Sequence, residues 1–393
     1  MVSNKIIVLA ERKTVMSETR STFAYVNEVE YRLKSTATLL GISDNTLRTN
    51  LEESGIPIRR SNQKTAGAPA IRIFDLPTIF QIAEYRRSKR LTRGPEGKRP
   101  IIIAIEIIKG GTGKTTTAAE VAVQLQLQGL KVLAIDIDIQ ANLTQLMGYE
   151  ADLTEDEAAG YGLNQDAIVT GTFANICMPL IDRNAKSVDA RTIIKHPFGP
   201  YGPAIIPADT FFSDLEHDIS KSSGKRELVF QKFFKESQQG NIPGLDVSDY
   251  DIVLFDCPPN ISFVATNALA CADIVIAPVK MESFTVKGLS RLIGEIHTLK
   301  SEYNIEVAEP ELVILPTYYS TNLPRVVRMQ GKLTQYRTNT SPVSISQSEE
   351  FPKSTEHYMP LTLIKPNCQA VQEYRMFTAY LIKKINEISR SRA

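Results

Sequence analysis

The feature that most constrains the fold is a series of short apolar segments that begins near Ile101. Five segments are rich in β-branched residues and bounded by turn residues: PIIIAIEII, LKVLAID, YDIVLFD, ADIVIAPV and ELVILPT. Runs of this kind are typical of strands that are buried on both faces of a parallel sheet. Stretches with helical spacing separate them. The pattern therefore predicts an α/β fold, a doubly wound and mostly parallel sheet.

A glycine-rich turn follows the first of these segments. Residues 109–116, KGGTGKTT, precede a helical pattern that reaches Gly129. Glycines let backbone N–H groups approach phosphate oxygens, and the start of a helix favours anions. In such a loop Lys114 reaches the terminal phosphates and the Thr115 hydroxyl binds Mg²⁺, although the strict pattern has glycine where Ile108 stands. The predicted nucleotide contacts are Lys109, Gly110, Gly111, Thr112, Gly113, Lys114, Thr115 and Thr116.

Aspartates end two further predicted strands. Asp256 ends YDIVLFD, and Asp136 and Asp138 lie two residues apart at the end of KVLAIDID. Parallel strands end at one edge of the sheet, so these carboxylates are expected beside the loop. One carboxylate can hold the hydration shell of Mg²⁺ while another orients an attacking water molecule. A single aspartate at a strand end is more often a helix cap, but three in this context favour a metal and catalytic site.

The N-terminal quarter of the chain is basic. Residues 1–100 hold 18 Lys and Arg against 10 Asp and Glu, whereas residues 101–393 hold 27 against 34. This asymmetry indicates that the first part of the chain contacts a polyanion, with an ordinary solvated surface as the alternative.

The sequence STATLLGISDNTLRTNLEESG, in this basic quarter, predicts two helices joined by a turn. Ser35 is expected to cap the first helix, and Ser43 or Asp44 the second, with Leu47 and Leu51 facing inward. This is the layout of a helix-turn-helix, whose second helix enters the major groove of DNA. The candidate base-reading residues are Asn45, Thr46, Arg48 and Thr49.

Two basic and apolar segments, IPIRR and PAIRIF, flank the polar sequence SNQKTAGA and predict a β-hairpin wing. A helix capped by Asp75 is expected next, and the basic, Pro- and Gly-containing stretch that follows predicts a linker. A chance helix-turn-helix pattern in an unrelated small helical domain is the alternative. The candidate DNA contacts of the wing are Arg59, Arg60 and Lys64. The predicted units are a winged helix-turn-helix at 26–90, a linker at 91–100 and the α/β domain at 101–393.

Composition excludes several classes of protein. The four cysteines form no C-x-x-C pair, which argues against a disulfide framework and a zinc site. No apolar stretch reaches the roughly 18 residues that a membrane span needs. A cytoplasmic protein without a membrane partner is expected.

The motifs together resemble a known family. The loop KGGTGKTT, the strands VLAIDIDIQANLT and YDIVLFDCPP, the segment TNALACADIVIAPVKMESFTVKGL and the later SEEFPKSTEH are similar to the deviant Walker A ATPases of the ParA/MinD group. The ParA partition ATPases are the most similar. The N-terminal unit resembles the extra domain of larger plasmid ParA proteins, which repress their own operon.

The resemblance implies ATP and Mg²⁺ as cofactors and a role for each site residue. It implies that Lys109 reaches the nucleotide of the partner subunit in a homodimer and Lys114 serves the subunit's own phosphates. It implies that Asp138 orients the hydrolytic water. The implied Mg²⁺ ligands or supports are Thr115, Asp136 and Asp256, and residues 1–25 form an N-terminal helix that could dimerise the protein without nucleotide.

Departures from the family pattern are also visible. Ile107 and Ile108 stand where family members commonly have Asn-Gln, and Cys257 stands where they usually have Thr. The loop PTYYSTNLP offers Thr317 and Asn322 as base or ribose contacts. Family members bind DNA without sequence preference through a basic surface in this part of the chain. The basic residues here that correspond to it are Arg325, Arg328, Lys332, Arg337, Lys353, Lys365 and Arg375.

The leading hypothesis is a weakly active plasmid-partition ATPase that binds nucleoid DNA and its own operator and is stimulated by a centromere-binding, ParB-like protein. A MinD-like ATPase at a membrane is the first alternative, because Phe377, Leu381, Ile385 and Ile388 form an apolar face near the C-terminus. Packing of that face on the α/β core is the preferred interpretation. A transcription or replication regulator switched by ATP is the second alternative.

Overall fold

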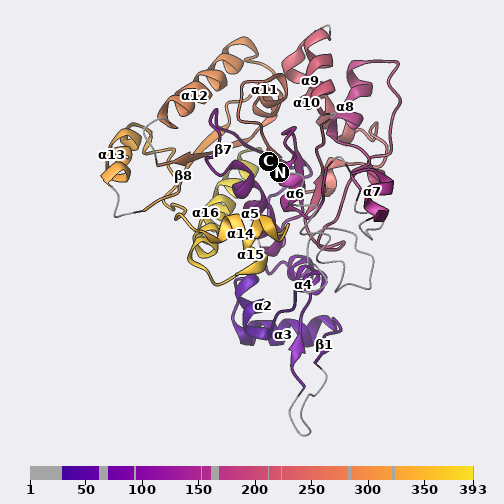
Figure 1. Ribbon diagram of the computed structural model, residues 1–393, viewed down its shortest axis with the longest axis vertical. Helices are drawn as coiled ribbons and strands as arrows, with labels where there is room; N and C mark the ends of the chain where they lie inside the picture. The colour runs from indigo at the N-terminus through magenta and orange to yellow at the C-terminus, as the bar shows by residue number, and fades with distance from the viewer. Residues whose placement is uncertain are drawn as a thin grey trace.

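The centre of the structure is a six-stranded parallel sheet (Figure 1). The computed structural model describes residues 29–61, 70–92, 94–151, 153–160, 168–210, 212–222, 224–281, 285–320 and 324–392. The strand order is β5-β4-β6-β3-β7-β8, and every neighbouring pair is parallel. The strands are β3 (Ile101–Ile105), β4 (Val132–Asp136), β5 (Ala204–Ile206), β6 (Ile252–Asp256), β7 (Ile274–Lys280) and β8 (Glu311–Thr317). The five predicted strands are confirmed, and the short edge strand β5 was not predicted.

Helices cover both faces of the sheet. Alternate residues of β3 show this, because Ile101, Ile103 and Ile105 belong to one apolar core and Ile102 and Ala104 to the other. The first core includes α5 (Lys114–Leu127) and α16 (Gln369–Arg392), and the second includes α8 (Phe173–Ile181), α10 (Val229–Gln238), α11 (Phe263–Cys271) and α12 (Thr285–Glu302). The remaining helices after β3 are α6 (Asn142–Leu146), α7 (Glu155–Gly160), α9 (Phe212–Lys221), α13 (Pro324–Leu333), α14 (Glu350–Glu356) and α15 (Leu361–Ile364). The predicted doubly wound fold is confirmed.

The C-terminal helix α16 packs on the core. Phe377, Leu381 and Ile385 are fully buried, Ile388 is partly buried, and the helix contacts α5. Its apolar face is therefore already covered by the protein. None of the helices in the described ranges is long and apolar enough to cross a membrane.

The N-terminal unit, residues 29–92, contains the expected helices and strand pair: α2 (Leu33–Leu39), α3 (Asp44–Ser54), β1 (Arg59–Arg60), β2 (Arg72–Ile73) and α4 (Leu76–Ser88). Ser43 caps α3 by accepting a hydrogen bond from Thr46 N, and Asp75 caps α4 in the same way. Leu47 and Leu51 are buried as predicted. The expectation for Ser35 is wrong, because α2 already begins at Leu33.

The N-terminal unit and the sheet domain share one apolar core. Residues of α2 and α4 belong to the same cluster as α5 and α16. Phe80 of α4 stacks on Phe198, with ring centroids 6.2 Å apart, and the Tyr31 hydroxyl donates to the Leu363 carbonyl. The stretch expected to be a linker is also anchored, since Glu96 N donates to the Ser389 hydroxyl at 2.6 Å. Sequence alone did not indicate this joint core.

Candidate nucleotide-binding site

The glycine-rich turn after β3 forms an open loop at the start of α5. Gly111 and Gly113 have φ angles of 68° and 90°, in the left-handed region that favours glycine. Gly113 occupies the N-cap position of α5, so the first free N–H groups of the helix face the loop. A cavity of about 350 Å³ opens there. Its lining comprises Gly110, Gly111, Thr112, Gly113, Lys114, Thr115, Thr116, Asp138, Gln140, Asn142, Leu146, Pro259, Tyr318 and Thr355.

The two lysines of the loop are in different environments. The ammonium of Lys114 is buried and donates to the carbonyls of Ile107, at 3.3 Å, and Lys109, at 3.2 Å. The side chain of Lys109 is exposed. Lys114 is therefore held inside its own loop, whereas Lys109 projects from it and is free to contact another molecule.

The departure at Ile107 has a packing explanation. Ile107 is fully buried and belongs to the apolar core on the α11 and α12 face of the sheet. An isoleucine here therefore adds to the apolar core just beyond the end of β3.

Asp136 is a fully buried carboxylate that is well supplied with donors. It accepts hydrogen bonds from Thr144 N and the Thr144 hydroxyl, both at 2.8 Å, and from Asp138 N at 3.2 Å. Burial raises the pKa of Asp136 to about 7, and these hydrogen bonds oppose the rise. Asp138, at the cavity wall, accepts a bond from Gln140 N at 3.0 Å. Asp136 therefore joins the end of β4 to α6, and Asp138 faces the cavity.

Asp256 has the opposite surroundings. It is the register partner of Asp136 on β6, it is fully buried, and neither of its carboxylate oxygens has a hydrogen-bond partner among the described residues. Burial and then the neighbouring Asp136 raise its pKa well above the usual value, and the nearby Thr115 hydroxyl and Lys114 ammonium oppose the rise without making a well-aligned hydrogen bond to it. An unpaired carboxylate in such a position is costly unless a cation or its water shell compensates it.

The residues present fit a magnesium ion. No group of three His, Cys, Asp or Glu side chains that could hold a metal occurs within the described ranges. Mg²⁺ does not require such a cage, since it usually binds one or two carboxylates, several waters and phosphate oxygens. Asp256 and the Thr115 hydroxyl would supply the protein's share.

Glu106 is a buried acid that sequence reasoning missed. It directly follows β3, it is 1% exposed, and its Oε2 atom has no partner among the described residues. Burial raises its pKa to about 8, and the nearby Lys114 lowers it. The sequence feature that could have indicated this residue is its position as the single charged residue in the apolar run PIIIAIEII. Its neighbour Cys257 is fully buried and burial raises its pKa, as expected for a small residue of the core.

A second, smaller cavity adjoins the loop beside Gly113 and Thr116, lined also by Thr317, Tyr318 and Tyr374. The Thr317 hydroxyl donates to the Thr112 carbonyl at 2.8 Å and ties the end of β8 to the loop. Tyr318 has a φ of 51° and places its ring 3.7 Å from where a Cβ at Gly113 would be. Sequence reasoning named Thr317 but not Tyr318, Gln140, Asn142 or Thr355. Asn322 lies outside the described residues.

The candidate base-reading residues Asn45, Thr46, Arg48 and Thr49 are all exposed on α3. Arg48 donates to the Asn45 side chain at 3.2 Å. On β1, Arg59 and Arg60 are exposed, and Arg59 pairs with Glu30. Lys64 lies outside the described residues.

The basic residues near the C-terminus are not equivalent. Arg328 and Lys332 are exposed on α13, where neither has a partner among the described residues. Lys353 pairs with Glu350 at 3.2 Å, and Lys365 pairs with the same carboxylate, so one acid offsets both lysines. Arg375 is half-buried and donates to the Pro366 carbonyl at 3.3 Å, so it is poorly placed to contact DNA. Arg337 is exposed. Arg325 also belongs to α13, but its side chain is not among those that the structure describes.

The sheet, the loop and the aspartates define a class: an α/β protein with a P-loop of the kind that binds nucleotides at the start of a helix. A family model described as an AAA domain matches residues 101–308, a little over half of the chain. The chain therefore belongs to this AAA domain family.

Relatives support this assignment. The sporulation initiation inhibitor protein Soj of Bacillus subtilis is 25% identical over 274 residues, covering 70% of this chain and 94% of its own. The chromosome partitioning protein ParA of Caulobacter vibrioides is 29% identical over 221 residues, 56% of this chain and 71% of its own. A Sinorhizobium fredii protein assigned as a replication protein A is 26% identical over 67% of this chain, which spans only 60% of that relative.

Solved structures show the same fold at low identity. An ATP complex of a McdA variant from Cyanothece has a TM-score of 0.56 and 19% identity, over 72% of this chain and 97% of that one. Cobyrinic acid a,c-diamide synthase from Mycobacterium smegmatis, with a bound ATP analogue and magnesium, has a TM-score of 0.54 and 20% identity, over 72% and 95%.

Proposed function

We propose that this protein is a DNA partition ATPase that forms a homodimer with ATP and acts in plasmid segregation. The observation that carries the proposal is the contrast between the two loop lysines. Lys114 is buried in its own loop, and Lys109 projects from the same loop into solvent. A lysine that serves the partner's phosphates makes charge neutralisation depend on dimerisation, which couples the nucleotide state to assembly.

ATP and Mg²⁺ are the proposed cofactors. Two structures of similar fold hold ATP, or an ATP analogue with magnesium. When phosphate oxygens enter the loop, the Lys114 ammonium exchanges two carbonyl partners for anionic ones, which are stronger acceptors. The Thr115 hydroxyl and Asp256 would hold Mg²⁺ or its water, and such an ion would supply positive charge beside the phosphate oxygens. Asp138 accepts a hydrogen bond from the attacking water and orients it.

An apolar rim supports dimerisation through the face that carries the loop. Ile139 lies between two residues that line the cavity and is 46% exposed, and Ile261, two residues after Pro259, is 59% exposed. Two exposed isoleucines close in sequence to cavity-lining residues would gain from being covered by another protein surface. A second copy of the chain that brings Lys109 to the cavity would also cover both isoleucines.

The proposed DNA contacts have two parts. The N-terminal unit acts as a winged helix-turn-helix on operator DNA, with the exposed residues of α3 facing base edges. Arg328 and Lys332 on α13 have no competing carboxylate in the described structure, so they are the best candidates for phosphate contacts with nucleoid DNA. A centromere-binding, ParB-like protein is the proposed stimulator of hydrolysis.

A replication or transcription regulator is the second candidate, favoured by the relative assigned as a replication protein A. In that case ATP is a switch, and the rate of hydrolysis is indifferent to DNA and to a partner protein. The MinD-like alternative loses its main support, because the apolar face of α16 is buried against the core.

The test compares wild type, Lys109→Ala and Lys186→Ala with ATP, ADP or no nucleotide. Lys186 is an exposed lysine that does not line the cavity, so it is the matched control. We expect ATP to favour a dimer with steeply salt-dependent binding to arbitrary DNA in the wild type and the control. Lys109→Ala should lose both and hydrolyse ATP more slowly. An unaffected Lys109→Ala variant would contradict the role of Lys109 in the partner's site.

A further inference from the structure

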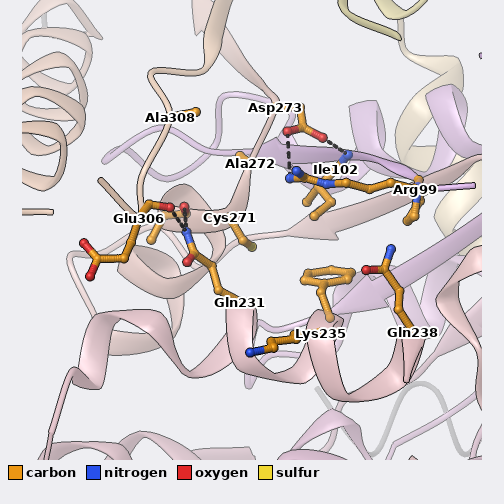
Figure 2. Close-up of a pocket in the computed structure, with 13 residues that line it drawn as sticks. Arg99, Ile102, Gln231, Lys235, Gln238, Cys271, Ala272, Asp273, Glu306 and Ala308 are labelled. Atoms are coloured by element: carbon orange, nitrogen blue, oxygen red, sulfur yellow. Dashed lines mark hydrogen bonds and ion pairs between the residues drawn. The ribbon is translucent and has the colours of Figure 1, made fainter. Parts of the chain in front are cut away.

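A separate cavity of about 330 Å³ lies at the opposite end of the sheet from the nucleotide-binding loop (Figure 2). It opens where β3 begins, and the loop follows the other end of β3. Five residues of strand separate the two ends, which corresponds to roughly 17 Å. Its lining comprises Arg99, Pro100, Ile102, Gln231, Phe234, Lys235, Gln238, Ala270, Cys271, Ala272, Asp273, Glu306 and Ala308. The proposed function uses none of these residues.

The inner wall of this cavity is apolar. Ile102, Phe234 and the segment 270–272 are all buried. Cavities with an aromatic and aliphatic lining and a few polar groups at the rim are typical of small-molecule sites, and this one is at the small end of their range of about 300–1,000 Å³. It therefore suits a ligand whose apolar body is about the size of one ring.

The acidic groups of the cavity already have partners. The Asp273 carboxylate accepts a hydrogen bond from Ile102 N at 2.8 Å and pairs with Arg99 at 3.4 Å and with Arg392. Glu306 pairs with Lys225. Neither carboxylate is available to attract a cation.

The cationic and hydrogen-bond-donating groups of the cavity outnumber its acidic groups. Arg99 and Arg392 share the single carboxylate of Asp273, and the Arg99 side chain is 58% exposed. Burial, and then Arg99, lowers the pKa of Arg392 to about 10, as expected where two guanidinium groups share one acid. Lys235 and Gln238 line the cavity from α10 and have no partner among the described residues. Figure 2 shows Arg99 and Asp273 on one side of the cavity and these two α10 residues on the other.

We propose that this cavity binds a small organic anion with an apolar body, the class to which aromatic and branched-chain carboxylates belong. The anionic group pairs with Arg99 and Lys235 and accepts a hydrogen bond from Gln238, because guanidinium and ammonium groups bind carboxylate and phosphate oxygens strongly. The apolar body covers Phe234 and Ile102. Arg99 then gains an anionic partner of its own, whereas the Asp273 carboxylate is 3.4 Å away and is shared with Arg392.

The test is titration calorimetry on the full chain with phenylacetate, 4-methylpentanoate and phenyl phosphate, each first without nucleotide and then with ADP and Mg²⁺ present. Phenylacetamide is the neutral control, since it has the same body without the charge. The variants are Arg99→Gln and Lys235→Gln, together with Ala308→Phe, which fills the cavity and removes no polar group. Lys232→Gln is the matched control, because Lys232 is exposed on α10 but does not line the cavity.

We expect at least one anion to bind about tenfold more tightly than phenylacetamide, and each cavity variant to weaken it by about tenfold while Lys232→Gln does not. The preference between phenylacetate and phenyl phosphate identifies the anionic group. Absence of saturable binding by all three anions overturns the proposal, as does equal binding of the amide. Loss of binding when ADP is added places the anion in the nucleotide cavity and overturns the proposal too. Both charge variants alter exposed side chains, so thermal melting should show that they are folded.

Discussion

Asp136 and Asp256 are register partners on neighbouring parallel strands, yet only Asp136 is supplied with hydrogen-bond donors among the described residues. Burial raises the pKa of both carboxylates, and the neighbouring Asp136 raises that of Asp256 further, so the pair costs stability. Asp136 therefore has a structural role, whereas the carboxylate oxygens of Asp256 remain available to accept further hydrogen bonds or to hold a cation. The family resemblance alone implied that both aspartates support Mg²⁺.

Asp256→Asn should make the nucleotide-free protein more stable and much less active. The amide removes an unpaired buried charge, so we expect the free energy of unfolding to rise by about 1–3 kcal/mol. Hydrolysis should fall by about 100-fold or more, because a charged support of the metal is lost. Urea unfolding and phosphate release at saturating Mg²⁺ check the two effects. A destabilised Asp256→Asn variant would show that the carboxylate has a protein partner.

Asp136→Asn should be destabilised instead. An amide cannot accept all three hydrogen bonds from Thr144 and Asp138, so we expect a loss of about 1–2 kcal/mol in the free energy of unfolding. The same urea experiment measures it. Equal shifts in the two asparagine variants would contradict the distinction between these aspartates.

Glu120 should make stability depend on pH. This buried residue of α5 accepts hydrogen bonds from Leu361 N, Thr362 N and the Thr362 hydroxyl, and burial raises its pKa from 4.5 to about 7. The folded protein therefore binds the proton more tightly than the unfolded chain. Its stabilising contribution is complete below pH 4.5 and is lost as the pH rises through 7.

Glu120→Gln supplies the measurement. Between about pH 5 and pH 8 we expect the wild type to lose about 2–3 kcal/mol relative to this variant, which cannot titrate. Other buried acids such as Glu106 are present in both proteins and cancel in the difference. Parallel stability curves from urea unfolding at each pH would show that Glu120 keeps one protonation state throughout.

Arg48→Ala should separate the two proposed modes of DNA binding. Arg48 is exposed on α3, and its loss should weaken binding to operator DNA by about 1–3 kcal/mol. Binding of the ATP form to arbitrary DNA should be unchanged. Fluorescence anisotropy with operator and scrambled duplexes measures both, with the exposed Arg183→Ala as the control. Equal losses on the two duplexes would assign Arg48 to phosphate contacts.

The parts of the fold that sequence predicted well are those with strong local signals. Five strands were apolar runs between turn residues, and Ser43 and Asp75 cap helices where the pattern placed them. The edge strand β5 was missed because its three residues, AII, are too few to show a pattern. The roles of Asp136 and Asp256 could not be separated either, because the donor that satisfies Asp136, Thr144, belongs to α6. Glu106 shows the same limit, since its burial depends on elements that are distant in sequence.

The shared core also limits which other DNA-binding units could replace the N-terminal unit. Phe80 stacks on Phe198, Leu39 and Tyr31 belong to the core shared with the sheet domain, and the stretch between the two parts is itself anchored on α16. A chimera that grafts a different DNA-binding unit before residue 101 would leave Phe198 and the outer side of α5 facing water. A replacement unit would therefore need its own apolar surface, shaped to cover Phe198 and α5, before the joined protein could fold well.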